Sequence, residues 1–68
     1  MRASSRLVMA VQGFGRRLGH PDMVWMEPDA GGWFVKWYEP PAPDVRAIYV
    51  SDDEAPNATT ENLLERMP

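Results

Sequence analysis

The stretch WFVKWYE, residues 33–39, decides the fold. It consists almost wholly of aromatic and β-branched residues, which favour a strand. Because successive side chains of a strand point to opposite faces, the stretch gives two sets: Trp33, Val35 and Trp37 on one face, and Phe34, Lys36 and Tyr38 on the other. A small sheet normally packs one face on a core and turns the other to water. Here both faces carry aromatics, so the second face exposes them unless another element covers it.

A shorter strand-forming segment precedes this strand in the sequence, and another follows it. Residues 23–27 predict a strand that ends at Pro28, and residues 28–32, PDAGG, supply the turn chemistry of a hairpin. After the central strand, Pro40, Pro41 and Pro43 interrupt pairing because proline has no amide hydrogen to donate. Residues 45–51 then resume a strand. Since short connections join neighbouring strands, the three runs predict an antiparallel meander.

An amphipathic helix is predicted over residues 4–18. Its apolar residues recur at the spacing of one helix face: Leu7, Val11, Phe14 and Leu18. Gly19 suits the left-handed position that follows a helix. Gly13 and Gly15 weaken a helix, and their position near the apolar stripe indicates that another element approaches closely there.

A second, shorter helix is predicted over residues 59–67, with Thr59 or Thr60 as its cap. This helix either covers part of the second sheet face or frays. The element order is therefore helix, three strands, helix. We predict a single small α+β domain over residues 1–68, of α-β-β-β-α order, with strands at 23–27, 33–39 and 45–51.

Composition excludes several classes of function. The chain has 68 residues, one histidine and no cysteine, which excludes a disulfide scaffold and a cysteine zinc site. No run of 18 apolar residues is present, so we expect no membrane span. A catalytic triad lacks its partners, and we expect no enzymatic activity, no cofactor and no metal site. We expect a cytoplasmic protein.

A chain this short gains about 3–5 kcal/mol from a single core. Large aromatic side chains are one means of adding burial, and self-association is another. The sheets of two copies could pair face to face or edge to edge. A homodimer, and with it a purely oligomerising structural domain, is therefore one interpretation.

Charge is distributed unevenly along the chain. The first 21 residues carry four arginines and no acid: Arg2, Arg6, Arg16 and Arg17. The rest of the chain carries all ten carboxylates against three basic residues, and the net charge is −3. A basic helix packed on an acidic remainder accounts for this asymmetry. The alternatives are a nucleic-acid surface formed by the four arginines and an organellar targeting segment over the first 20 residues.

Aromatic residues of the predicted sheet are candidate binding anchors, because Trp and Tyr dominate interface energetics. Trp33, Trp37 and Tyr49 are the predicted anchors, and core packing is the alternative role for the same residues. The loop Asp52-Asp53-Glu54 would steer a basic partner. We therefore expect a small acidic protein-binding module that occupies a basic cleft of a larger protein. An inhibitor or adaptor fits this description, of the kind phages encode against host machinery or defence.

One known family resembles the predicted order of elements, and a second resembles its three strands followed by a helix. The double-stranded RNA-binding domain is similar in order and length, but residues 62–67, NLLERM, offer one arginine where that domain presents a lysine cluster. Residues 32–38, GWFVKWY, resemble the central strand of the arm-binding domains of tyrosine recombinases, whose sheets are basic. The sheet predicted here is flanked by acidic residues. Neither resemblance carries functional residues over, and we assign no family.

Overall fold

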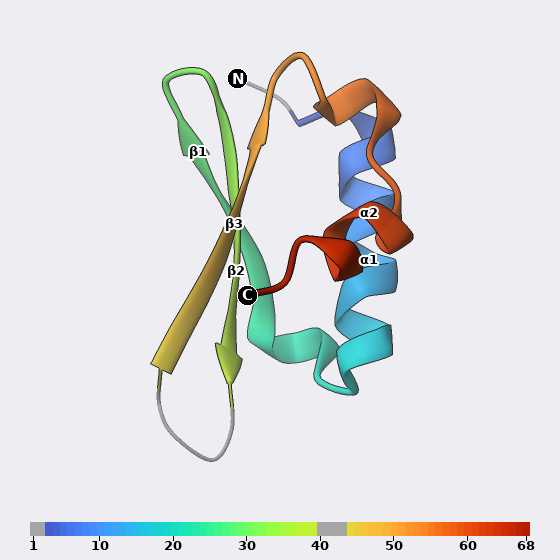
Figure 1. Cartoon of the computed structure of the whole chain (residues 1–68), viewed down its shortest axis with the longest axis vertical. Helices are drawn as coiled ribbons and strands as arrows, with labels where there is room; N and C mark the ends of the chain where they lie inside the picture. The colour runs from blue at the N-terminus through green and yellow to red at the C-terminus, as the bar shows by residue number, and fades with distance from the viewer. Residues whose placement is uncertain (1–2, 40–43) are drawn as a thin grey trace.

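The computed structural model describes residues 3–39 and 44–68, so Arg2 and the prolines at 40, 41 and 43 lie outside the described residues. Its element order confirms the predicted α+β arrangement (Figure 1). The elements are α1 (Ser5–Leu18), β1 (Val24–Asp29), β2 (Gly32–Glu39), β3 (Asp44–Ser51) and α2 (Thr60–Glu65), with the 3-10 turns η1 (Pro21–Met23) and η2 (Ala55–Asn57).

The three strands form one antiparallel sheet with β2 in the centre. β1 continues past its predicted end, through Pro28 to Asp29, so a two-residue turn at Ala30 and Gly31 replaces the predicted five-residue loop. Pro28 lies opposite Trp33 on an edge strand. Proline is tolerated there because its nitrogen can face outward, where no strand needs its hydrogen.

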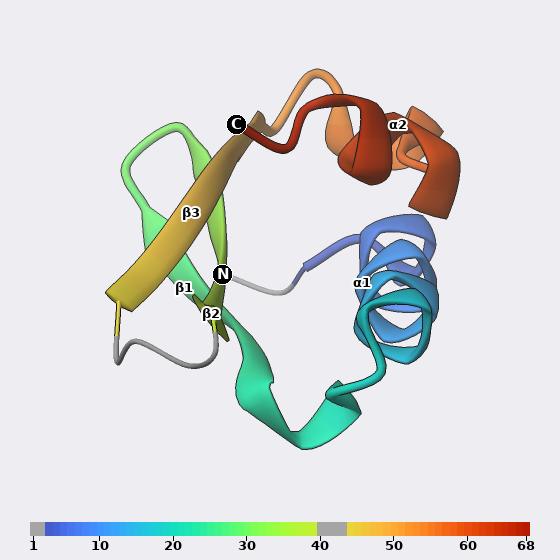
Figure 2. The same cartoon turned by 60° about the horizontal axis from the view of Figure 1, so that its bottom comes forward.

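Both helices pack on the same face of the sheet (Figure 2). The buried core joins this face to the helices and comprises Leu7, Ala10, Val11, Phe14, Trp33, Val35, Trp37, Ile48, Val50, Ala55 and Leu63. At its centre the rings of Phe14 and Trp37 meet edge to face, with centroids 5.0 Å apart. The sheet face that carries Trp33, Val35 and Trp37 is therefore the inner one.

The close approach predicted from the helix glycines is confirmed. A Cβ on Gly13 would overlap Thr60 Oγ1, and one on Gly15 would lie 3.1 Å from Pro21 Cα. The hydroxyl of Thr60 donates a 3.1 Å hydrogen bond to the carbonyl oxygen of Ala10. Gly13 thus lets α2 rest directly on α1.

Capping side chains begin both helices. The Ser4 hydroxyl accepts from the N–H of Arg6, and the Thr59 hydroxyl accepts from the N–H of Asn62. Gly19 ends α1 in the left-handed conformation, with φ of 79°.

Candidate functional site

The sheet face turned away from the helices carries aromatic and aliphatic side chains that are exposed or half-buried. We call it the open face, and its side chains belong to Trp25, Glu27, Phe34, Lys36, Tyr38, Val45, Ala47 and Tyr49. Neither helix lies over it (Figure 2). Tyr38 is 44% exposed and Val45 is 49% exposed. The aromatic second face expected from the sequence is therefore uncovered within the part of the chain that the structure describes.

The aromatic side chains of the open face form two pairs across neighbouring strands. The rings of Trp25 and Tyr38 lie 5.1 Å apart, and those of Phe34 and Tyr49 also lie 5.1 Å apart, close to edge to face. The ammonium of Lys36 lies between them, 5.5 Å from the centroid of the Phe34 ring. Aromatic contacts of this geometry add about 0.5–1.5 kcal/mol beyond the area they bury.

Glu27 contacts both an aromatic residue and the lysine of the open face. Its carboxylate accepts a 2.7 Å hydrogen bond from the indole N–H of Trp25 and pairs with Lys36 Nζ at 2.9 Å. The hydrogen bond from Trp25, followed by the contact with Lys36, lowers the pKa of Glu27 below its ordinary value. The side chains of the open face are thus held in place before any partner binds, which reduces the entropic cost of binding.

The structure separates the three predicted anchors. Tyr49 lies on the open face, but Trp33 is 9% exposed and Trp37 is 1% exposed, both in the core. The indole N–H of Trp37 is also satisfied internally, by Glu39 at 2.8 Å. These two tryptophans therefore present too little surface to anchor a partner in the folded protein. The physical reason is that α1 and α2 both cover the face on which they lie.

Three aromatic residues were missed as candidate anchors: Trp25, Phe34 and Tyr38. Lys36 indicates from the sequence that these residues face solvent, because it shares a face of the strand with Phe34 and Tyr38. An ammonium group is costly to bury, so the face that carries Lys36 is the one turned to solvent. The second helix does not change this, because α2 packs through Leu63 into the core on the other side of the sheet.

The sheet region is rich in acidic residues. Residues 24–54 carry seven carboxylates against Lys36 and Arg46. Partial burial of the Tyr49 phenol raises its pKa, and the carboxylates of Asp29, Asp52 and Glu54 raise it further. The register places two of these acids at the end of the open face that carries Tyr49, because Asp29 lies opposite Gly32 and Asp52 directly follows Ser51, the partner of Gly32 in β3. The three predicted steering residues differ in role, since Asp52 and Asp53 are exposed in the turn after β3, whereas Glu54 is held by local hydrogen bonds.

The described arginines of the first helix lie in the other layer of the molecule. Arg6, Arg16 and Arg17 are exposed on α1, and Arg17 Nη1 lies 3.5 Å from Glu61 Oε2 on α2. One of the three positive charges is thus partly offset by a neighbouring acid. α1 is therefore basic, whereas α2 carries Glu61 and Glu65 and the sheet region is acidic.

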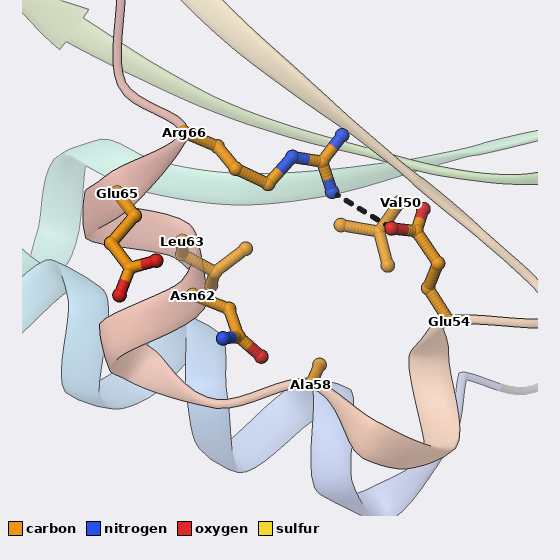
Figure 3. Close-up of a pocket in the computed structure, with 7 residues that line it drawn as sticks. All are labelled: Val50, Glu54, Ala58, Asn62, Leu63, Glu65 and Arg66. Atoms are coloured by element: carbon orange, nitrogen blue, oxygen red, sulfur yellow. Dashed lines mark hydrogen bonds and ion pairs between the residues drawn. The ribbon is translucent and has the colours of Figure 1, made fainter.

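A pocket of about 330 Å³ lies between β3, η2 and α2 (Figure 3). Val50 and Leu63 line it, and Glu54 and Arg66 face each other at one side, with Nη1 and Oε2 3.4 Å apart. Arg66 also donates to the carbonyl oxygen of Tyr49. The charged groups of the pocket are therefore already engaged with the protein itself, which argues against a small-molecule site.

No family model, curated protein or solved structure matches this chain. Within residues 3–39 and 44–68, no group of three acidic or histidine side chains converges in the way a metal ion requires. Over the same residues, neither helix combines the length and the apolar character needed to cross a bilayer. The assignment of function thus rests on the surface itself.

Proposed function

We propose that this protein is a small protein-binding module that docks its open face on a basic surface of a larger protein. The observation that carries the proposal is the open face itself, on which two aromatic pairs lie outside the core. Contiguous exposed apolar surface on a small domain marks an interaction site. Trp and Tyr side chains in such a surface supply most of the binding energy.

Charge favours a basic partner over a second copy of this chain. Glu27 and Asp29 of each copy lie on the open face against Lys36, so two open faces that met would bring together two surfaces of net negative charge. Like charges at an interface cost free energy, whereas a basic surface would be attracted and guided into place. An inhibitor or adaptor that covers a basic cleft would act in this way.

The first experiment is a measurement of solution mass by light scattering at two protein concentrations and two salt concentrations. We expect a monomer under all four conditions. A stable dimer would favour the alternative of an oligomerising structural domain, because self-association would then cover the aromatic residues.

The second experiment maps the binding surface with matched variants. Trp25→Ala and Tyr38→Ala remove one aromatic pair of the open face, whereas Met9→Ala removes a 67% exposed side chain from α1. For a partner isolated by its affinity for the wild type, each open-face variant should lose about 2 kcal/mol, roughly thirtyfold. Met9→Ala should bind as the wild type does, and added salt should weaken binding throughout.

The same set of variants tests the nucleic-acid alternative. If duplex DNA or RNA binds, the affinity should depend on Arg16 and Arg17 and fall steeply with salt. Loss of binding in an Arg16→Ala/Arg17→Ala variant, with Tyr38→Ala unaffected, would contradict the proposed protein-binding function.

A further inference from the structure

β3 is an edge strand, and its pairing with β2 fixes which of its backbone groups face outward. The N–H of Asp52 donates to the carbonyl oxygen of Gly31 at 2.9 Å, next to the opposed residues Gly32 and Ser51. Hydrogen-bonded and non-hydrogen-bonded pairs alternate along an antiparallel ladder. Four residues of β3 are therefore in non-hydrogen-bonded pairs with β2, and their N–H and C=O groups point away from the sheet: Val45, Ala47, Tyr49 and Ser51.

The close spacing at Gly32 supports this assignment. A Cβ added to Gly32 would lie 2.8 Å from Ser51 Cα. Opposed residues come closer in a non-hydrogen-bonded pair than in a hydrogen-bonded one. The strands therefore approach closely at Gly32, which agrees with a non-hydrogen-bonded pair.

In the second half of β3, side chains form hydrogen bonds with outward-pointing backbone groups of the strand. Glu54 Oε1 accepts from the N–H of Ser51 at 3.1 Å, and Arg66 donates to the carbonyl oxygen of Tyr49. Figure 3 shows that the two side chains also contact each other. The Glu54–Arg66 pair therefore blocks this part of the edge, as proteins commonly do to prevent unwanted strand pairing.

The first half of β3 is different. Residues Asp44–Ala47 are all exposed, and among the described residues no hydrogen bond reaches the outward backbone groups of Val45 and Ala47. This half, yellow in Figure 1, lies away from both helices in Figures 1 and 2. An unpaired edge of this kind is a template for another strand. The opposite edge, β1, contains Pro28 and is less suited to pairing.

A second copy fits this edge poorly in each symmetric antiparallel register that uses these outward groups. Pairing centred on Val45 sets Ala47 opposite Pro43, which has no amide hydrogen. Pairing centred on Arg46 places two arginines directly opposite each other, which is destabilising. Pairing centred on Ala47 requires the carbonyl of Tyr49, which Arg66 already occupies. These mismatches favour a strand of another protein as the occupant over a symmetric pair of copies.

We propose that an extended basic segment of the partner adds to β3 at Val45–Ala47 as a fourth strand, and that the Glu54–Arg66 pair ends the pairing before Tyr49. This inference rests on the proposed function. Alternate side chains of the added strand would lie beside Val45 and Ala47 on the open face, so the edge and the face would form one continuous surface. Asp44 at the start of β3 and Glu39 opposite it favour lysine or arginine in the added strand, at positions other than the one opposite Arg46.

A ten-residue peptide of alternating lysine and valine is the probe, and a peptide of alternating lysine and proline is its control. The two carry the same charge, but the proline peptide cannot donate backbone hydrogen bonds from every second residue. In amide NMR spectra, the valine peptide should shift the Val45 and Ala47 resonances and slow their exchange with solvent at least threefold. The proline peptide should do neither.

Ala47→Pro supplies the decisive variant, with Ala47→Val as its match. Proline removes the outward N–H of residue 47 but spares the ladder to β2, which does not use that hydrogen. Valine retains it. We expect Ala47→Pro to bind the valine peptide at least tenfold more weakly than Ala47→Val, with unchanged circular dichroism. If Ala47→Pro unfolds, the amide exchange of the wild-type protein decides the question.

The possible results separate this inference from the proposed function. Equal binding by the two Ala47 variants, with shifts confined to Trp25 and Tyr38, would overturn the edge inference and leave the open face as the site. If the valine peptide slows amide exchange at Val45 and Ala47 equally in the wild type and in Trp25→Ala, the result would support the edge inference and count against the open face as a binding site. A wild-type dimer that Ala47→Pro dissociates would overturn it by making a second copy the occupant. Absence of peptide binding to the wild type would also overturn it.

Discussion

The indole N–H of Trp25 donates a 2.7 Å hydrogen bond to the carboxylate of Glu27, two residues further along the same strand. The same relationship recurs on the other face of the sheet, where the indole of Trp37 donates to Glu39 at 2.8 Å. Residues i and i+2 of a strand share a face, so a Trp-x-Glu sequence satisfies the indole locally. On the open face this arrangement also holds Lys36, and it fixes three side chains at a prospective interface.

Glu27 should make stability depend on acid pH. Its pKa is lowered on folding, first by the hydrogen bond from Trp25 and then by Lys36. A carboxyl group with a lowered pKa stabilises the folded state above its unfolded pKa, near 4.5, and that stability is lost as pH falls through the folded value. Urea unfolding of the wild type should therefore show a fall in stability below pH 4.5 that is smaller in Glu27→Gln.

Direct titration of the Glu27 carboxyl by NMR checks the cause. In Trp25→Phe, which keeps an aromatic ring but has no indole N–H, the pKa of Glu27 should rise towards its ordinary value. A wild-type pKa at or above 4.5 would contradict the assignment.

Trp37 and Tyr38 are neighbours in β2, but their replacement by alanine should have opposite consequences. Trp37 is almost completely buried, and truncation of a buried tryptophan costs about 3–5 kcal/mol. That is comparable to the whole stability expected from one core of this size, so Trp37→Ala should lose its near-UV circular dichroism and cooperative urea transition. Tyr38→Ala removes one contact with Trp25 and should lose about 1 kcal/mol while remaining folded. If both variants lost a similar free energy of unfolding, the two faces of the sheet would contribute equally to stability, which would contradict the assignment of one face to the core.

The faces of the sheet illustrate what the sequence can and cannot predict. The period-two alternation in residues 33–39 correctly divides the side chains into two sets, and the apolar stripe of residues 7–18 correctly predicts a helix that packs on one of them. Both sets are rich in aromatics, so alternation alone does not say which one the helices cover. The predicted anchors Trp33, Trp37 and Tyr49 accordingly come from both faces, and Tyr49 alone of the three lies on the open face.

Other features depend on contacts between distant segments. Residues 28–32 predict a turn because their proline, aspartate and glycines favour one, whereas β1 continues through Pro28 to Asp29 because an edge strand tolerates proline. Arg66 and Glu54 are twelve residues apart and belong to different elements. Both side chains reach the edge of β3 because α2 is packed against the sheet in one particular orientation. Local sequence patterns do not determine that orientation.

Gly13→Ala should destabilise the protein, although alanine is the better helix former. In an exposed helix this change gains up to about 1 kcal/mol. Here the added Cβ would overlap the Thr60 hydroxyl, which is itself held by the carbonyl of Ala10. Overpacking of this kind costs about 1–3 kcal/mol, so urea unfolding should show a net loss of stability.

A double-mutant cycle isolates the cause of that loss. In a Thr60→Ala background the obstructing hydroxyl is absent, and Gly13→Ala should then become neutral or stabilising. The same loss of stability in both backgrounds would show that the close approach of α1 and α2 is not responsible.

Tyr49 should ionise at a higher pH than an ordinary tyrosine. Partial burial disfavours the phenolate, and the nearby carboxylates of Asp29, Asp52 and Glu54 disfavour it further, so its pKa is raised above 10.0. The unfolded chain would release the phenolic proton more easily than the folded protein, and stability should therefore decline as pH rises above 10.0. The chain has two tyrosines, so phenolate absorbance in Tyr38→Phe reports Tyr49 alone.

In that variant the titration midpoint should lie above 10.0, and Asp52→Asn should move it downward by removing one of the negative charges that oppose ionisation. The direction of this movement tests the electrostatic argument for a basic partner, because it measures the field of the acidic residues at the aromatic surface itself. A midpoint that Asp52→Asn leaves unchanged would mean that this carboxylate does not act on Tyr49. The attraction of a basic partner would then have to come from acids elsewhere on the sheet.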